Sequence, residues 1–250
     1  MLEAIDKLGQ EITKEMYENG LIETWMNNKA HSGGWKLVSG IWSPFYLQMR
    51  KITSYPKLLS KVGKFLSMVI GEYCPKFDAL VGIAMAGIPI ATSTSIHSNI
   101  PSCYTRKIEG LKKLDEFQEK IQSYGGHSLI EGILKDGYNV ALVDDLVTKF
   151  TTKMIAVKLL EYETRQRSIE VDCKSVIVLF DREQGAVEEA QKHGVKLYSG
   201  IPFKSKGLMW LKGVWSDLEG EVVREYLENP DKYQKEDKQL ELREIAEKNK

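Results

Sequence analysis

The sequence lacks any surplus of charge. Its 250 residues contain 35 Lys and Arg against 35 Asp and Glu, so the formal net charge is zero. Proteins that hold nucleic acid or anionic membranes through bulk electrostatics carry an excess of basic residues. The neutral total therefore excludes a general polyanion binder, and we expect neither nucleic acid nor membrane as a partner.

Cysteine and long apolar runs are also scarce. The three cysteines, Cys74, Cys103 and Cys173, form no Cys-x-x-Cys pair and no cluster with histidine. This pattern predicts a cytoplasmic protein without a metal held by its own side chains. The first 20 residues lack the uninterrupted apolar core of a secretory signal, so we expect Met1 to begin the folded protein. The ordinary mix of 28% charged and 42% hydrophobic residues excludes disordered, collagen-like and membrane-spanning classes.

What the sequence does contain is an alternation of short apolar runs with helical patterns. Residues 56–73 place apolar side chains on one face at helical spacing, and Pro56 suits the first turn of a helix. The predicted strands are residues 79–85, 101–106, 138–143 and 174–180, and the other predicted helices are residues 151–163 and 184–193. This order predicts an α/β fold with a mostly parallel sheet flanked by helices. The charged segment from residue 229 onward is expected to be an exposed helix or a frayed end.

The most informative local pattern follows the third predicted strand. Asp144 and Asp145 end that strand, and Thr148, Thr151 and Thr152 lie in the turn that opens the next helix. A helix N-terminus with hydroxyl groups can hold a phosphate, and paired carboxylates can accept hydrogen bonds from sugar hydroxyls. Alternatively, one Asp caps the helix and the other is a solvated turn residue.

Further segments extend this pattern along the chain in a fixed order. They are VSGIWSPFYLQMR at 38–50, VGIAMAGIPIA at 81–91, YTRK at 104–107 with YGGHSLIEG at 124–132, VALVDDLVTKFTT at 140–152, and LFDREQG at 179–185. Together they resemble the type I phosphoribosyltransferases, in particular the orotate phosphoribosyltransferase family.

The resemblance implies the fold of that family, with a small hood built from both ends of the chain. We expect a single domain over residues 1–250. Within it, N-terminal helices and a hood segment occupy 1–55, an α/β core occupies 56–204, and a C-terminal helical extension occupies 205–250. In the family, a mobile loop reaches the site of the neighbouring subunit, which implies a homodimer.

The implied activity is transfer of the 5-phosphoribosyl group from 5-phosphoribosyl 1-diphosphate (PRPP) to orotate, with Mg²⁺ bound mainly by substrate oxygens. The products would be orotidine 5-phosphate and diphosphate, in pyrimidine biosynthesis. The residues that the resemblance assigns to catalysis are Asp144, Asp145, Lys112 and Lys113. Those assigned to PRPP are Arg106, Lys107, Asp144, Asp145, Leu146, Val147, Thr148, Lys149, Phe150, Thr151 and Thr152. Those assigned to orotate are Tyr46, Thr148 and Arg182. For the cations Arg106, Lys107 and Arg182, the alternative is a solvated surface position.

Three positions depart from the family pattern. Phe150 stands where the family has glycine in the phosphate loop, so its ring either blocks the loop or packs aside. Ala86 and Val38 stand where family members carry lysine, so fewer cations meet the diphosphate. These departures leave two other functions open: a PRPP-binding or nucleotide-binding regulator without activity, and a phosphoribosyltransferase for another base.

The long segment after Lys107 allows two interpretations. A lid that closes over the diphosphate would exclude water from the reaction. The same residues also fit an ordinary amphipathic surface helix, and the two interpretations are compatible. Because the segment is longer than the family arrangement, neither Lys112 nor Lys113 aligns uniquely, and His127 is not clearly the loop histidine.

Overall fold

The computed structural model describes residues 1–37, 40–111 and 113–248. Within these residues a six-stranded sheet forms the centre, in the order β10-β9-β8-β5-β6-β7. Its strands are β5 (Ala79–Gly82), β6 (Ser102–Thr105), β7 (Ile130–Glu131), β8 (Tyr138–Val147), β9 (Val171–Asp181) and β10 (Lys196–Pro202). All neighbours are parallel except β6 and β7. The predicted α/β class and its four strands are confirmed, whereas β7 and β10 were not predicted.

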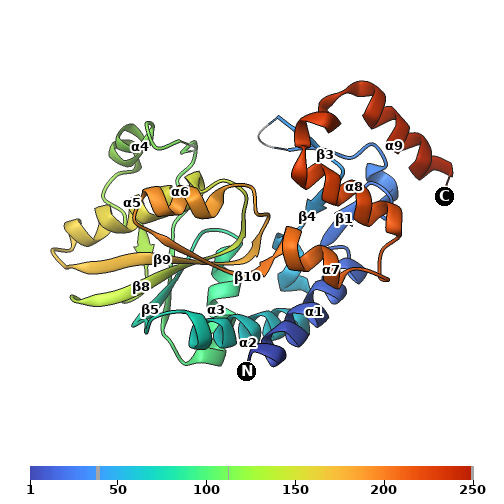
Figure 1. Cartoon of the computed structure of the whole chain (residues 1–250). Helices are drawn as coiled ribbons and strands as arrows, with labels where there is room; N and C mark the ends of the chain where they lie inside the picture. Colours follow the sequence, from blue (N-terminus) through green and yellow to red (C-terminus); the bar gives the residue numbers. More distant parts are fainter. Residues whose placement is uncertain (38–39, 112, 249–250) are drawn as a thin grey trace.

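Helices cover both faces of this sheet, as Figure 1 shows. Along β8, Ala141 and Val143 pack on the face covered by α2 (Pro56–Tyr73) and α3 (Gly87–Ser98). Val140 and Leu142 face the opposite cluster, which contains residues of α5 (Thr151–Gln166) and α6 (Ala186–Lys192). Burial on both faces explains why β8 is a continuous apolar run and not an alternating one.

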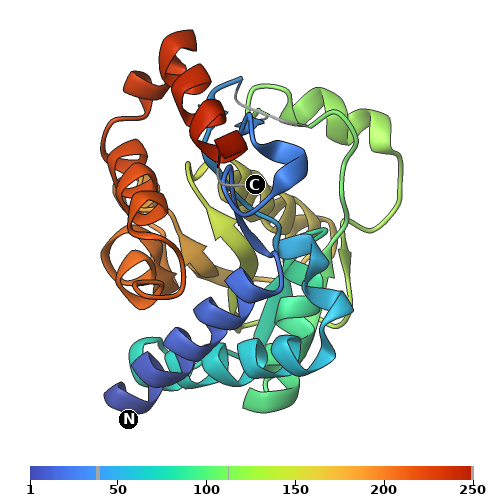
Figure 2. The same cartoon turned by 90° about the vertical axis from the view of Figure 1, so that its right-hand side faces the viewer.

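The two ends of the chain pack together into the expected hood, beside the sheet (Figures 1 and 2). The N-terminal part comprises α1 (Leu2–Glu18), β1 (Ile22–Thr24), η1 (Lys29–His31), β2 (Trp35–Lys36), β3 (Trp42–Ser43), β4 (Phe45–Leu47) and η2 (Met49–Ser54). The C-terminal part comprises η3 (Phe203–Gly207), α7 (Leu208–Trp210), α8 (Asp217–Glu228), η4 (Pro230–Gln234) and α9 (Glu236–Lys248). Strand β1 pairs with β4, and β2 pairs with β3.

Contacts between the two parts are specific. The Trp25 indole donates a hydrogen bond to the Leu242 carbonyl at 3.1 Å, and the Thr24 hydroxyl donates to the buried Glu219 carboxylate at 2.5 Å. Leu242 and Ala246 of α9 are buried against the core. The prediction of an exposed or frayed tail was therefore wrong for one face of α9, because that face covers Trp25.

The expected lid segment folds against α5 in this structure. It contains α4 (Phe117–Tyr124), and its apolar side chains Ile108, Phe117 and Ile121 cluster with Ile155 and Leu159 of α5. This is the amphipathic surface helix that the sequence allowed. No helix of the described ranges is long and apolar enough to cross a membrane.

Candidate active site

The acidic pair lies at the carboxyl end of β8, and its two members have different surroundings. Asp144 is only 7% exposed, and its Oδ2 atom lies 2.8 Å from the ammonium of Lys153, which is itself buried in the first turn of α5. The other oxygen, Oδ1, accepts a hydrogen bond from the Asp145 amide at 2.9 Å. Neither carboxylate is merely a helix cap, since α5 has no side-chain cap bond.

Asp145 is less buried than Asp144 and belongs to the partly exposed residues of the loop. Burial, and after it the neighbouring Asp144 carboxylate, raise the pKa of its carboxyl group to about 7, although the Lys153 ammonium acts in the opposite direction. A carboxyl group that titrates near neutral pH is typical of functional sites.

A cavity of about 190 Å³ joins the acidic loop to the hood. Tyr46 and Arg50 line it from β4 and η2, Asp145 lines it from β8, and Arg182 lines it from the end of β9. The structure therefore brings together three residues that the sequence predicted separately: Tyr46, Asp145 and Arg182. Thr148, the other predicted orotate residue, does not line this cavity.

Arg182 is the most unusual group in the cavity. Its side chain is 6% exposed, its Nε and Nη2 atoms have no hydrogen-bond partner among the described residues, and its guanidinium lies 4.5 Å over the Phe45 ring. Burial lowers its pKa, and the Tyr226 hydroxyl opposes that shift. Its amide donates to the Val147 carbonyl at 3.1 Å, which fixes it beside the acidic loop. A buried cation without a carboxylate partner is costly unless an anion completes it. The interpretation of Arg182 as a solvated surface cation is wrong.

A second cavity, of about 560 Å³, lies over the loop between β5 and α3. Ala84, Met85 and Ala86 line it from that loop, and Lys107 and Arg50 also contribute. Arg50 thus borders both cavities. The loop approaches β8 closely, because a Cβ atom at Gly87 would lie 2.3 Å from the Val143 carbonyl oxygen. Only glycine permits this approach, which places the loop beside Asp144.

Phe150 packs aside and does not obstruct the loop. Its side chain is fully buried in the core cluster under α5 and α6, and its φ of −78° is one that any residue adopts. The next residues, Thr151 and Thr152, are exposed in the first turn of α5. The loop therefore needs no glycine at position 150, and its free face is formed by Thr148, Lys149 and the amides that begin α5.

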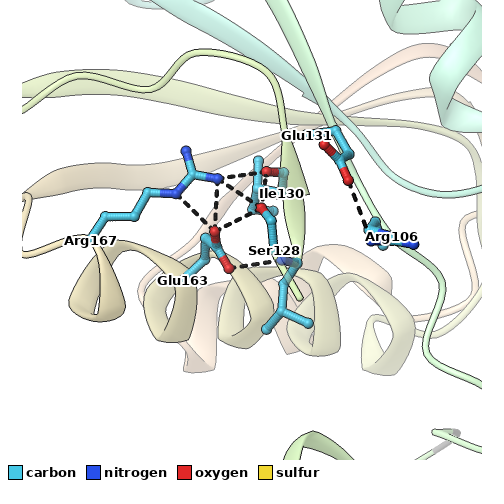
Figure 3. A network of polar contacts seen from close by, with 7 residues as sticks. Arg106, Ser128, Ile130, Glu131, Glu163 and Arg167 are labelled. Atoms are coloured by element: carbon cyan, nitrogen blue, oxygen red, sulfur yellow. Dashed lines mark hydrogen bonds and ion pairs between the residues drawn. The ribbon is translucent and has the colours of Figure 1, made fainter. Parts of the chain in front are cut away.

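Both ends of the lid segment are fastened to each other and to α5 (Figure 3). The Arg106 amide donates to the Leu129 carbonyl at 2.8 Å, and the Leu129 amide donates to the buried Glu163 carboxylate at 2.8 Å. Arg167 pairs with Glu163 at 2.7 Å and donates to the Ile130 carbonyl at 2.6 Å. The two ends of the segment, at Arg106 and at residues 128–130, are therefore bonded to each other or to α5.

Other predicted residues lie apart from the cavities. Arg106 is exposed, 3.5 Å from the Glu131 carboxylate (Figure 3). Lys113 is exposed, and its amide donates to the Glu116 carboxylate at 3.1 Å. His127 is exposed and contacts the Tyr124 ring edge-on, at 6.2 Å between centroids. The predicted catalytic Lys112 and the substituted position Val38 lie outside the described residues.

Comparison with known proteins bears on this arrangement. No protein-family model matches the chain. The chain is 33% identical over 172 residues to the orotate phosphoribosyltransferase of Methanocaldococcus jannaschii, an alignment that covers 69% of this chain and 86% of that protein. The chain belongs to the orotate phosphoribosyltransferase family.

Solved structures agree with the family. Leishmania donovani UMP synthase gives a TM-score of 0.69 at 26% identity, over 88% of this chain and 42% of that one. The orotate phosphoribosyltransferase of Aeropyrum pernix gives a TM-score of 0.59 at 24% identity, over 81% of this chain and 97% of that one, and so shares the fold. The predicted family and fold are confirmed.

Sequence reasoning missed two residues that lie at the cavities or at the acidic loop. Arg50 is the last residue of the family-like segment 38–50, and the sequence prediction gave it no role. Its basic side chain at the end of that segment was the signal that could have marked it as a binding residue. Lys153 directly follows the Thr-rich turn, and its burial was not predicted, because a lysine in a first helical turn is ordinarily exposed.

Proposed function

We propose that the protein transfers the 5-phosphoribosyl group of PRPP to orotate, giving orotidine 5-phosphate and diphosphate. The observation that carries this proposal is the buried, incompletely bonded guanidinium of Arg182 in a cavity shared with Tyr46 and Asp145. A planar base with a carboxylate fits these groups, because the carboxylate pairs with the guanidinium in a bidentate manner and the ring packs against Tyr46. Membership of the family supports the choice of orotate.

The remaining groups match the parts of PRPP. The amides that begin α5, with Thr148, Thr151 and Thr152, suit the 5-phosphate, because a helix N-terminus favours an anion. Lys107 lines the cavity over the loop after β5, where the diphosphate would lie, and Arg50 lies between that cavity and the base. Asp145 lies on the side of the ribose.

In the reaction the bond from ribose C1 to the diphosphate oxygen breaks, and its electron pair leaves with the diphosphate. Orotate N1 supplies the pair for the new bond to C1 and gives up its proton to solvent. Positive charge builds on the ribose ring as the bond breaks, and the ionised Asp145 carboxylate stabilises it. Arg50 and Lys107 stabilise the negative charge that the leaving group gains.

Mg²⁺ fits this site when it enters bound to the diphosphate of the substrate. No group of three His, Cys, Asp or Glu side chains in the described part of the chain could hold a metal ion, and Lys153 already occupies one oxygen of Asp144. Mg²⁺ keeps several waters and binds phosphate oxygens readily. When bound to the diphosphate, it would neutralise charge on the leaving group, with Asp145 as the available protein carboxylate.

The test of this function is incubation of the protein with orotate, PRPP and Mg²⁺, with orotidine 5-phosphate as the measured product. Calorimetric titration with PRPP separates the alternatives. Binding of PRPP without turnover of orotate or of any base in a panel would support the regulator. Turnover of a base other than orotate would show that the protein is a phosphoribosyltransferase for that base. Absence of both binding and turnover would reject the whole proposal.

We also propose a homodimer in the cytoplasm. Met85 and Ile96, on the loop after β5 and on α3, are 62% and 75% exposed, and exposed apolar side chains favour an interface. Three cysteines without disulfide bonds are consistent with a reducing compartment. Sedimentation equilibrium tests the dimer.

A further inference from the structure

Lys153 occupies a position that lysine rarely takes. It lies in the first turn of α5 with 4% of its surface exposed, and a lysine this buried is almost always paired. Its ammonium contacts two groups of the acidic loop, the Asp144 carboxylate at 2.8 Å and the Leu146 carbonyl at 2.5 Å. These bonds tie the strand end of the loop to the helix that follows it.

Both carboxylate oxygens of Asp144 have partners within the protein. One of its oxygens binds Lys153 and the other accepts the Asp145 amide, so both oxygens are engaged inside the protein. Asp145, in contrast, lines the cavity together with Arg50 and Arg182. The two adjacent carboxylates therefore differ: Asp144 is bonded within the protein, whereas Asp145 borders a cavity.

We propose that Lys153 is a positioning residue that withdraws Asp144 from the substrate, so that Asp145 alone contacts the ribose of PRPP. This inference rests on the proposed function. The resemblance assigned ribose to both acids, whereas the geometry assigns Asp144 to holding the loop. The Lys153 charge also cancels that of Asp144, so the loop presents one negative charge and not two to an incoming diphosphate.

A double-substitution cycle tests the division of roles. Asp145→Asn should lower kcat by about 100-fold or more, because it removes a charge that acts on the developing cation. Lys153→Met and Asp144→Asn should each lower kcat/KM for PRPP by about tenfold, since each leaves a buried partner unpaired. The combined variant, with neither charge, should recover to within about fivefold of the wild type, because a coupled pair is removed as a unit.

The control is Lys158→Met, which removes an exposed lysine of the same helix and should leave the kinetics unchanged. If the combined variant is as impaired as Asp145→Asn while its thermal unfolding resembles that of the wild type, Asp144 touches substrate and the inference is overturned. A wild type that neither binds nor converts PRPP would instead reject the proposed function. If Lys153→Met does not fold, the combined variant still gives the decisive comparison.

The pH profile gives a second readout that a purely structural role would not move. The charged groups around Asp145 are Asp144 on β8, Lys153 on α5, Arg182 after β9 and Arg50 on η2. Lys153→Met removes a cation that favours the ionised form of Asp145, so the rise of kcat with pH should move to higher pH. An unchanged midpoint in a folded, active variant would contradict the inference.

Discussion

Single ionisable side chains determine the chemistry that this site can perform. Arg182 and Asp145 lie around one cavity, and both have lost much of the water that would solvate their charges. Removing that water makes each interaction with a bound anion or cation stronger than at the surface. The same desolvation makes the empty site costly to fold, which leads to measurable effects on stability.

The pH dependence of the free energy of unfolding should show the raised pKa of Asp145. Its pKa of about 7 in the folded protein exceeds the ordinary value of 3.8, so its contribution to the free energy of unfolding is fully present below pH 4 and is lost as the pH rises through 7. Because one pKa unit corresponds to about 1.4 kcal/mol, the loss is on the order of a few kcal/mol. Urea unfolding measures the change: from pH 5 to pH 8, the free energy of unfolding should decrease less for Asp145→Asn than for the wild type. Equal decreases would show that Asp145 titrates normally.

Phe150→Gly should destabilise the protein and not improve binding of PRPP. The ring is fully buried, so its removal should lower the free energy of unfolding by about 3–5 kcal/mol. Glycine is acceptable at an N-cap, so the loss would report the ring and not the backbone. Phe150→Leu is the matched control and should cost less. Unchanged stability with tighter PRPP binding would show that the ring obstructs the loop.

Arg50→Gln should weaken the diphosphate side of the site. Because Arg50 borders both cavities, we expect KM for PRPP to rise by about tenfold and inhibition by free diphosphate to weaken in parallel, a loss typical of a charged contact. Arg224→Gln removes an exposed arginine of α8 that borders neither cavity and serves as the control. Equal kinetics for the two variants would exclude Arg50 from the site.

At the scale of elements, α5 connects the acidic loop with the lid. Its first turn holds Asp144 through Lys153, and its last turns hold Ser128, Leu129 and Ile130 through Glu163 and Arg167. One helix therefore contacts both the acidic loop and the two ends of the segment that contains α4.

Arg167→Met should loosen the base of the lid. The substitution leaves the buried Glu163 carboxylate with fewer partners, so we expect unfolding free energy to fall by about 1–3 kcal/mol. Hydrogen exchange at residues 128–131 should accelerate, as measured by mass spectrometry. Arg165→Met, an exposed arginine of the same helix with only a 4.0 Å contact to Glu161, is the control. Equal protection in both variants would contradict the anchoring role.

At the scale of the whole molecule, the N-terminal part of the hood lines the cavity and the C-terminal part packs behind it. Tyr46 belongs to β4, and its neighbour in that strand, Phe45, packs against α8. The centroids of the Phe45 and Tyr226 rings are 5.9 Å apart. The C-terminal helices therefore support the wall of the site, although they contribute no lining residue of that cavity.

A pair of leucines on α9 tests this support. Leu242 is 1% exposed and Leu240 is 56% exposed, so Leu242→Ala should lower the free energy of unfolding by about 2–4 kcal/mol and Leu240→Ala should change it little. Denaturant unfolding of both variants is the measurement. A similar effect for both would show that α9 does not cover the core.

Much of the fold could be predicted from local patterns. The apolar runs of β5, the middle of β8 and the second half of β9 are buried on both faces, and their sequences are correspondingly continuous. Strand β6 alternates exposed and buried residues, and it was recognised from its place between turn signals. Strand β10 was missed because it lies at the edge of the sheet and contains Lys196, Ser199 and Gly200, which weaken the apolar signal. The tail was misjudged because its composition is mostly charged, and only contact with Trp25 shows that one face is covered.

The sequence by itself determined the neutral charge, the order of strands and helices, and the ordered segments that identify the family, because these depend on residues close together in the chain. Tertiary structure decided which of the candidate groups meet. Tyr46, Asp145 and Arg182 come from distant segments, and only packing of the hood on the sheet brings them around one cavity. It also decided that Phe150 is core and that Lys153 neutralises Asp144, since burial depends on neighbours that no local pattern specifies.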